Sequence, residues 1–458
     1  MGVNPVGVAA HADAVSRLKR SYDALDPTAP IRLSKRTSNL FRQRVVASTP
    51  GLDVSGLDGV ISIDPAARTV DVQGMCTYED LVAATLPHGL IPLVVPQLKT
   101  ITLGGAVTGL GIESTSFRNG LPHESVVEME IFTGAVEVVI ATPHNEHADL
   151  FAAFPNSYGS LGYATRLRIE LEAVPGFVEL THVRFDSLEA AAKAIDVISE
   201  SREWSGMDVD AVDGTAFSPD EVYLSLATFT DRQQRTSDYT GQHIYYRSIQ
   251  HRHRDALTMH DYLWRWDTDW FWCSAAFGAQ NAYLRRLWPK RFRRSDVYHR
   301  LIGLDTRWGL SARLDKLRKV PGRERVIQDI EVPAPRLAEF GHWFDDHVGM
   351  RPLWLCPLRL RGDRVWPLYP LSPHTTYVNV GFWGTVQVPA GSLDGMLNRK
   401  IERKVTELGG HKSLYSDAFF DRETFDSIYG SETLDPLRKR YDPSGRLSGL
   451  YEKAVIQR

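Results

Sequence analysis

Four glycines within eight positions set the strongest limit on how this chain can fold. They lie in the segment Pro96–Gly120, which reads PQLKTITLGGAVTGLGIESTSFRNG. Glycine has no Cβ atom and readily adopts positive φ, so such a segment can bring its backbone close to a ligand. Clustered backbone N–H groups can then hold a pyrophosphate, although the spacing alone is equally typical of a glycine-rich turn in a sheet. The glycines are Gly104, Gly105, Gly109 and Gly111.

The same segment departs from the glycine motif of nicotinamide-dinucleotide sites. Gly109 and Gly111 begin a G-x-G-x-x-G pattern, but Ser114 occupies the position of its third glycine. In that motif the third glycine lets the helix pack closely against its strand. The sequence therefore argues against a nicotinamide-binding fingerprint at this place.

The order of predicted elements indicates an α+β chain in three parts. Its 458 residues exceed what one core usually holds, so two or three domains are expected. We predict a first domain over residues 15–175. A cap domain follows over 176–392, with a long Arg- and Trp-rich insert at 230–325. Residues 393–458 are mainly helical and polar, and we expect them to return towards the first domain.

Local patterns support this division. The first part predicts a helix over His11–Tyr22, a helix over Tyr78–Leu86 capped by Thr77, and a hairpin joining 126–132 to 136–141. In the second part a strand–helix–strand–strand order occurs twice, which is typical of one antiparallel sheet covered by helices. The two repeats are predicted at 178–185, 188–202, 207–212 and 222–229, and at 326–332, 336–347, 352–360 and 376–382.

Composition excludes several classes of protein. The chain is 43% hydrophobic and 24% charged, with a formal net charge of −3, so it is expected to be globular and not to bind nucleic acid. Its three cysteines are far apart, which favours neither a disulfide framework nor a zinc site. We found no signal-peptide pattern and no run of ~20 apolar residues, and therefore expect a cytoplasmic protein without a transmembrane segment.

Two further clusters carry weaker signals. His251, His253 and His260 lack a carboxylate or cysteine that would complete a metal site, so no metal is expected. The basic segment Arg285–Arg294 favours a surface or acidic-lipid contact over nucleic acid, because the whole chain is nearly neutral. The aromatic run Trp264–Trp272 is either core or the wall of a mixed apolar and polar pocket.

The glycine segment belongs to a longer series of matching elements. Thr102–Gly105, Gly109-x-Gly111 and Asn119-Gly120 resemble the second FAD loop of the vanillyl-alcohol oxidase and p-cresol methylhydroxylase (PCMH) family, and Asp149-Leu150-Phe151 with Gly159-Ser160-Leu161-Gly162 resemble a later element of it. The resemblance covers residues ~30–175 and implies a two-subdomain FAD-binding domain of the PCMH type. The FAD contacts that it implies in this part are Thr102, Leu103, Gly104, Gly105, Gly109, Gly111, Ser114, Ser116, Gly159 and Gly162.

The matching first FAD loop lies at Leu33–Leu40. In the family this loop often carries a histidine bonded covalently to the flavin, and here it has none, so the resemblance implies non-covalent FAD. Hydroxyls and backbone of this loop can bind a diphosphate whose charge a basic side chain balances. The alternative is a solvated basic turn. The implied contacts are Lys35, Arg36, Thr37, Ser38 and Asn39.

A narrower resemblance extends over most of the chain. Leu103–Ser116, Trp354–Pro357 and Asp421–Phe425 are similar to segments of the Δ24-sterol reductase family. The sequence departs from that family in two places, and these departures concern the expected substrate more than the expected cofactor. Trp264–Trp272 stands where those reductases have a His/Arg-rich stretch, and the membrane anchor of the animal enzymes has no counterpart here.

The resemblance implies an FAD-dependent oxidoreductase of lipid metabolism. It would reduce an isolated C=C bond of an apolar, sterol-like substrate and take electrons from NADPH. Two alternatives remain open: an alcohol or aldehyde oxidase or dehydrogenase of the same fold, and a non-catalytic flavin-binding protein whose insert contacts a partner or a membrane surface.

Two residues are candidates for the proton chemistry of such a reaction. Glu113 directly follows the second glycine loop, where burial could make it an acid or where it could organise the loop. Tyr415 lies in a segment that resembles the flavin-facing C-terminal region of the sterol reductases. It could donate a proton or only pack with one hydrogen bond. We favour Tyr415 as donor and Glu113 as a loop-organising residue.

Overall fold

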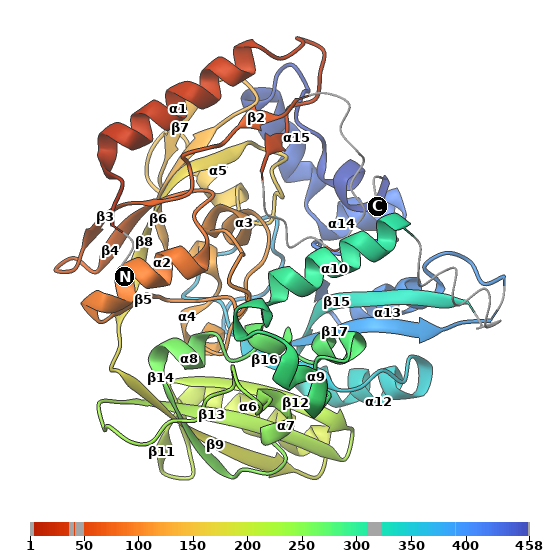
Figure 1. Ribbon diagram of the computed structural model, residues 1–458. Helices are drawn as coiled ribbons and strands as arrows, with labels where there is room; N and C mark the ends of the chain where they lie inside the picture. Colours follow the sequence, from red (N-terminus) through yellow and green to blue (C-terminus); the bar gives the residue numbers. More distant parts are fainter. Residues whose placement is uncertain (1–3, 36–40, 42–49, 309–321, 390, 457–458) are drawn as a thin grey trace.

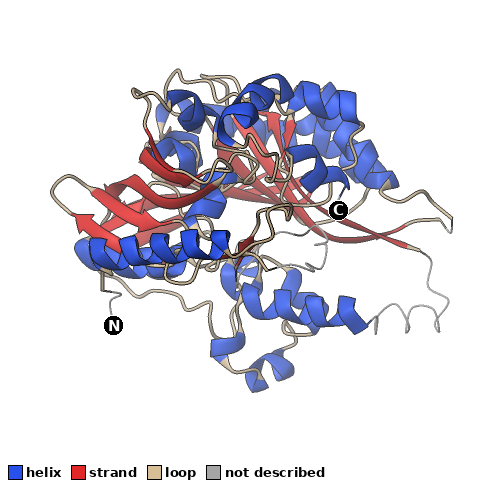
Figure 2. Ribbon diagram, turned by 90° about the horizontal axis from the view of Figure 1, so that it is seen from above, coloured by secondary structure: helices blue, strands red, loops and turns tan. Residues whose placement is uncertain are grey.

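The computed structural model confirms an α+β fold built around two sheets (Figure 1). It describes residues 4–35, 41, 50–308, 322–389 and 391–456. The first sheet belongs to the N-terminal part and the second to the predicted cap. Figure 2 shows the strands gathered in the interior with helices around them.

The first sheet has six strands in the order β3-β4-β8-β6-β7, with β5 paired to β8. Its long strand β8 pairs antiparallel with β4, β5 and β6 and so holds the sheet together. The strands are β3 (Val60–Asp64), β4 (Thr69–Gln73), β5 (Leu90–Pro92), β6 (Val126–Phe132), β7 (Val138–Ala141) and β8 (Tyr163–Ala173). The helices nearby are α1 (Gly7–Asp23), α2 (Tyr78–Thr85), α3 (Leu103–Thr108), α4 (Ser116–Asn119) and α5 (Ala148–Ala153).

Local signals in this part were accurate. The Thr77 side chain accepts a hydrogen bond from the amide of Asp80 and caps α2 as predicted. The predicted hairpin forms between β6 and β7. The predicted first helix is α1, which buries His11, Ala14 and Leu18.

The second sheet has eight strands in the order β14-β9-β13-β12-β16-β17-β15-β18. The two predicted repeats form its two halves, and antiparallel pairing of β12 with β16 joins them. The first half contains β9 (Phe177–Phe185), α6 (Leu188–Ser201), β12 (Ala211–Ser218) and β13 (Glu221–Thr230). The second contains β15 (Arg323–Pro333), α12 (Leu337–His347), β16 (Leu353–Leu358) and β17 (Tyr377–Gln387).

One predicted strand was wrong. The stretch 207–212 is divided between β11 (Met207–Asp208), which forms a hairpin with β10 (Glu203–Trp204), and the start of β12. The break occurs because the Asp210 carboxylate accepts a hydrogen bond from the amide of Phe229 at 2.7 Å, and the Val209 amide donates to the carbonyl of Arg202. These side-chain and turn contacts replace the ladder bonds of a continuous strand.

The insert and the C-terminal segment both join the cap to the rest of the molecule. From the insert, β14 (Arg254–Thr258) adds an edge strand beside β9. The C-terminal segment contributes α13 (Met396–Glu407) and β18 (His411–Lys412) to the cap, and then α14 (Arg422–Ile428) and α15 (Ser431–Tyr441). Tyr441 donates to Asp149 at 3.0 Å, so the chain returns to the first part of the molecule. We propose domain boundaries near 175 and 392.

The sequence predicted neither a membrane-spanning helix nor a metal site. Within this part of the chain, no helix has both the length and the apolar character needed to cross a membrane. The described residues also contain no group of three His, Cys, Asp or Glu side chains placed to hold a metal ion.

Candidate functional site

The glycine segment starts with the short helix α3, whose first amides are used by the fold. Leu103 N–H donates to the carbonyl of Cys76, and Gly104 N–H donates to that of Gly74, both at 2.9 Å. Gly105 N–H donates to the Thr102 hydroxyl at 3.2 Å. These three donors therefore have partners inside the protein, and a bound phosphate would need other donors.

The glycines themselves have different roles. None of the four glycines has positive φ, so of the two uses of glycine considered from the sequence, positive φ and close approach, only close approach can apply to them. A Cβ on Gly104 would lie 2.5 Å from the carbonyl oxygen of Gly74, so this glycine lets α3 pack against a neighbouring backbone. Among the described residues, a Cβ on Gly105 would meet only the Thr102 hydroxyl, at 2.9 Å. Gly105 therefore presents the open side on which a ligand could approach.

Gly109 and Gly111 are packing glycines like Gly104. A Cβ on Gly111 would come within 2.8 Å of ring carbons of Pro96 and Pro122. Gly109 lies against the ring of Tyr158, whose nearest carbon would be 3.2 Å from an added Cβ. The contact with Tyr158 connects the glycine segment to the next part of the site.

The turn 156–162 joins the glycine segment to the C-terminal part of the chain. Tyr158 N–H donates to the carbonyl of Thr108 at 2.7 Å, and the Tyr158 hydroxyl accepts from the amide of Leu414 at 3.0 Å. Gly159 and Gly162 in this turn have φ of +77° and +129°, which a residue with a side chain rarely adopts. The structure thus brings together three segments that the sequence had singled out.

Phe41, the residue directly after the first predicted FAD loop, lies at the same place. Four of its predicted contacts, Arg36, Thr37, Ser38 and Asn39, lie outside the described residues. Phe41, just beyond them, donates its amide hydrogen to the carbonyl of Tyr415 at 2.9 Å, and its ring lies 5.9 Å from that of Tyr415. Lys35, which ends the described part before the loop, is half-buried.

Buried polar atoms without a partner test whether this junction fits a polar cofactor. Hydroxyls in the turn 156–162 and beside Tyr415 make no hydrogen bond among the described residues although they are enclosed. A buried hydroxyl normally has a partner, so these atoms fit FAD, a ligand rich in donors and acceptors. The atoms are Ser157 Oγ, Ser160 Oγ, Asn156 Oδ1 and Ser416 Oγ.

Tyr415 lies where the C-terminal segment meets the cap sheet. Its hydroxyl accepts a hydrogen bond from Trp383 Nε1 at 2.9 Å, and the carboxylate of Asp329 on β15 lies beside it. Asn379 donates to the same carboxylate at 2.9 Å. Burial raises the pKa of Asp329 to about 7, although the bonds from Asn379 and Tyr415 oppose that rise. Burial, with Asp329 beside it, also holds the pKa of Tyr415 well above its usual value.

Sequence reasoning missed Asp329. It lies in the predicted strand 326–332, where charged and apolar residues alternate as they do in a strand with one solvated face. In the structure Asp329 is only half-exposed, and Glu331 on the same face is buried. An acidic residue within a strand of the predicted cap was the available signal, but nothing local distinguishes it from an exposed one.

Aromatic side chains surround Tyr415. The Phe41 ring stacks on Trp270 at 5.4 Å between centroids, and His299 lies 5.6 Å from Phe41. The Phe271 ring lies 4.4 Å from Trp383. Trp266, Trp270 and Phe271 are all buried, so the run 264–272 is core as one of the two predictions had it, and its role as a pocket wall stays a prediction.

Glu113 belongs to a second buried cluster. Its Oε1 accepts from the Ser114 hydroxyl at 2.6 Å and from Arg265 Nη2 at 3.0 Å, and the same Nη2 donates to Asp213 at 3.0 Å. Ser116 Oγ accepts from the Glu113 amide at 3.1 Å. Burial raises the pKa of Glu113, and the guanidinium of Arg265 opposes that rise. The predicted contacts Ser114 and Ser116 are thus engaged within the fold.

The two clusters lie on one face of the cap sheet. The Trp354 indole donates to Asp213 at 3.2 Å, and Trp354 pairs in register with Gly381, which in turn pairs with Asp329. Residues paired directly across antiparallel strands point to the same side. Among the described residues, no hydrogen bond or ion pair joins Glu113 to Tyr415, so the two catalytic candidates lie in separate clusters.

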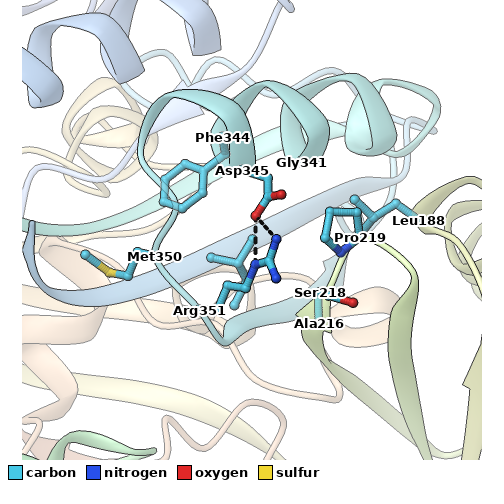
Figure 3. Close-up of a pocket in the computed structure, with 10 residues that line it drawn as sticks. Leu188, Ala216, Ser218, Pro219, Gly341, Phe344, Asp345, Met350 and Arg351 are labelled. Atoms are coloured by element: carbon cyan, nitrogen blue, oxygen red, sulfur yellow. Dashed lines mark hydrogen bonds and ion pairs between the residues drawn. The ribbon is translucent and has the colours of Figure 1, made fainter.

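A small pocket on the opposite side of the sheet has no such chemistry. Figure 3 shows it between α6, α12 and the end of β12, where Arg351 Nε donates to Asp345 at 2.7 Å. The lining is mainly apolar, and none of the predicted site residues belongs to it. Its lining residues are Leu188, Ala216, Ser218, Pro219, Gly341, Phe344, Asp345, Met350, Arg351 and Leu353.

Comparison with known proteins supports the first sheet as a cofactor domain. Residues 10–142 match the family model described as FAD binding domain. The chain is 25% identical over 419 residues to a protein named Delta(24)-sterol reductase from Mus musculus, covering 86% of this chain and 75% of that protein. It is 24% identical over 453 residues to one of the same name from Arabidopsis thaliana, covering 88% and 76%.

A third relative is similar over a shorter stretch. Cytokinin dehydrogenase 6 from Oryza sativa subsp. japonica is 32% identical over 149 residues, which is 32% of this chain and 28% of that protein. By contrast, the similarity to the sterol reductases extends over most of the chain, as predicted from the segments at 103–116, 354–357 and 421–425.

Proposed function

We propose that this chain, an FAD-dependent oxidoreductase with an FAD binding domain and a similarity to Delta(24)-sterol reductases over most of its length, reduces an isolated C=C bond of an apolar, sterol-like substrate. NADPH would supply the electrons, and the FAD would be held without a covalent bond. The observation that carries the proposal is the Tyr415 hydroxyl, held between Trp383 and Asp329 where the predicted cofactor segments converge.

Several residues where the predicted cofactor segments meet would together hold the cofactor. Reduced FAD, when bound, supplies a hydride to one carbon of the double bond. The open side of Gly105, the buried hydroxyls of Ser157 and Ser160, and the first loop would hold its polar groups. The aromatic rings of Phe41 and Trp270 exclude water from the adjoining space.

Tyr415 is the proposed proton donor to the second carbon. Its raised pKa keeps the hydroxyl protonated at neutral pH, and the Trp383 indole N–H fixes its oxygen. Asp329, with a pKa of about 7, can return a proton to Tyr415 after each turnover. The substrate then gains one hydride and one proton, and the double bond becomes a single bond.

Anaerobic flavin spectroscopy tests this function. Purified protein is mixed with NADPH, then with a sterol carrying a side-chain double bond, and in a separate run with an alcohol in air. Bleaching by NADPH followed by recovery on addition of the alkene supports the reductase. Peroxide formation with an alcohol would instead identify an oxidase, and a flavin that no donor reduces would point to a binding protein.

The mode of FAD attachment has its own test. Acid precipitation is expected to release all yellow flavin into the supernatant, because the predicted first loop has no histidine. Flavin that remains in the pellet would contradict non-covalent binding.

A further inference from the structure

The insert carries an exposed surface in which apolar and basic side chains alternate. It is formed by α9 (Ala282–Leu287), which lies on the near side of the molecule in Figure 1, and by the 3-10 turn η5 (Lys290–Phe292). Tyr283 is 83% exposed and Leu287 81%. Leu284 and Phe292 are also exposed. Large apolar side chains this exposed and this close together mark an interaction surface.

The charges of this surface have one sign. Residues 281–295 contain no aspartate or glutamate and six arginines or lysines. Arg286, Lys290 and Arg291 are exposed. Lys290 also pairs with the exposed Asp238 at 3.0 Å. We call the exposed set Tyr283, Leu284, Arg286, Leu287, Lys290, Arg291 and Phe292 the insert surface.

Two other arginines of this segment, Arg285 and Arg293, are buried and anchor the backbone beneath the insert surface. Arg285 is buried and makes a two-pronged ion pair with Asp269, with N–O distances of 2.6 and 3.0 Å. Arg293 donates to the carbonyls of Thr240 and Gly241, both at 2.7 Å. Because these buried contacts fix α9 and η5, the backbone that carries the exposed side chains is held in place. The basic segment predicted at 285–294 thus divides into structural and surface arginines.

We propose that the insert surface docks on an anionic lipid bilayer. Tyrosine, leucine and phenylalanine side chains insert at the headgroup boundary, while arginine and lysine contact negatively charged headgroups. A nucleic-acid partner would not use the exposed leucines, and the charged residues within 281–295 are all basic, which suits anionic headgroups better than a protein surface of mixed charge. The combination of apolar and basic groups therefore fits a lipid surface best.

Aromatic contacts connect this surface to the candidate site. The Trp288 ring, between α9 and η5, lies 6.2 Å from Tyr298 on α10 (Ser295–Trp308). On the next position of α10, His299 contacts Phe41 and Trp270, which lie beside Tyr415. Delivery of an apolar substrate along this side rests on the proposed function, whereas docking on lipid does not.

Vesicle co-sedimentation of the full-length protein tests the docking without any turnover. Vesicles of phosphatidylcholine alone are compared with vesicles containing about one third phosphatidylglycerol. We expect the wild type to sediment with the anionic vesicles and the double variant Tyr283→Ser/Leu287→Ser to remain in solution. Leu393→Ser is the matched control, because that leucine is 80% exposed on another part of the surface, and it should sediment like the wild type.

A charge variant separates the basic from the apolar contribution. Arg286→Glu/Arg291→Glu is expected to weaken binding to anionic vesicles by at least fivefold for each arginine, since a cation near the surface contributes about 1 kcal/mol. Lys400→Glu/Lys439→Glu changes the net charge equally on α13 and α15 and should sediment like the wild type.

Three results would overturn the proposal. In the first, the wild type does not sediment with anionic vesicles. In the second, variants of the insert surface sediment as well as the wild type. In the third, the wild type is a dimer in light scattering and Tyr283→Ser/Leu287→Ser converts it to a monomer. The last result would make the insert surface a contact between two copies. Flavin content is measured in every sample, so loss of docking with full flavin leaves the proposed reaction untouched.

Discussion

The two faces of the eight-stranded sheet are both covered, yet they differ in chemistry. One face packs against α6, α12 and α13 through apolar side chains such as Leu224, Leu355 and Phe382. The other carries polar residues, among them the buried Asp213 and Glu331 and the half-buried Asp329. A buried apolar face needs only close packing, whereas each buried polar group costs free energy unless it has a partner or a task.

The difference identifies where function is concentrated. On the polar face, Asp213 accepts hydrogen bonds from Arg265, Trp266 and Trp354, so its charge is fully used by the fold. Asp329 is held by Asn379 and Tyr415 and keeps a pKa of about 7. The polar face therefore contains one cluster that organises the loop around Glu113 and one that can exchange a proton.

The largest effect should come from removing one hydroxyl on the polar face. Tyr415→Phe is expected to lower alkene reduction by ~10²–10⁴-fold with full flavin, because general acid catalysis typically contributes that much. Turnover and flavin absorbance are measured on the same sample. Tyr429→Phe is the control, since that buried hydroxyl donates only to the carbonyl of Lys412. Equal rates for Tyr415→Phe and the wild type would remove Tyr415 as donor.

A matched change on the apolar face should affect stability only. Phe382→Ala is expected to lower the free energy of unfolding by ~3–5 kcal/mol, the usual effect of emptying the space of a buried phenylalanine. Denaturant unfolding checks the loss, and turnover per bound flavin should stay near that of the wild type at low temperature. A fall in turnover per flavin comparable to that of Tyr415→Phe would mean that the two faces are not independent.

The pH dependence of Asp329 gives a smaller effect with a defined sign. Its pKa in the folded protein is raised from 3.8 to about 7, so the folded state holds this proton more tightly than the unfolded state. The stabilisation is present at low pH and is lost as pH rises from about 4 to 7. Asp329→Asn should remove this part of the slope.

Unfolding at pH 5 and pH 8 measures that slope in the wild type and in Asp329→Asn. Comparing the two proteins cancels other carboxyl groups such as Glu124, whose pKa is also raised to about 7. Turnover of the wild type should fall as pH rises through 7, and the variant should lack that inflection. Identical profiles would show that Asp329 takes no part.

The smallest effect is expected at Glu113. The amide of Glu113→Gln keeps the shape of the side chain, its oxygen can still accept from Ser114 and Arg265, and Arg265 keeps its second partner Asp213, so the variant should lose about 1 kcal/mol of stability and little turnover. Glu402→Gln is the contrasting control, since it leaves the buried Lys412 without its 2.6 Å carboxylate partner and should cost ~3–5 kcal/mol. A ~100-fold loss of turnover in Glu113→Gln with full flavin would make Glu113 the proton donor.

Sequence patterns predicted elements better than they predicted the site. The two strand–helix–strand–strand repeats depend on local periodicity and were found at nearly the expected positions. The alternation in β15 could not indicate the surroundings of Asp329, because the residues beside it, Asn379 and Tyr415, are distant in sequence. For the same reason the Gly104 contact with Gly74 and the burial of Arg285 beside exposed Arg286 were not visible in the sequence.

The central claim is that FAD binds between the glycine segment and the polar face of the cap sheet, and a crystal structure of the FAD complex tests it most directly. We predict that the flavin ring lies in van der Waals contact with Tyr415 and that Ser157 or Ser160 donates to the cofactor. A flavin bound on the helix-covered face, or one whose ring is remote from Tyr415, would contradict the account.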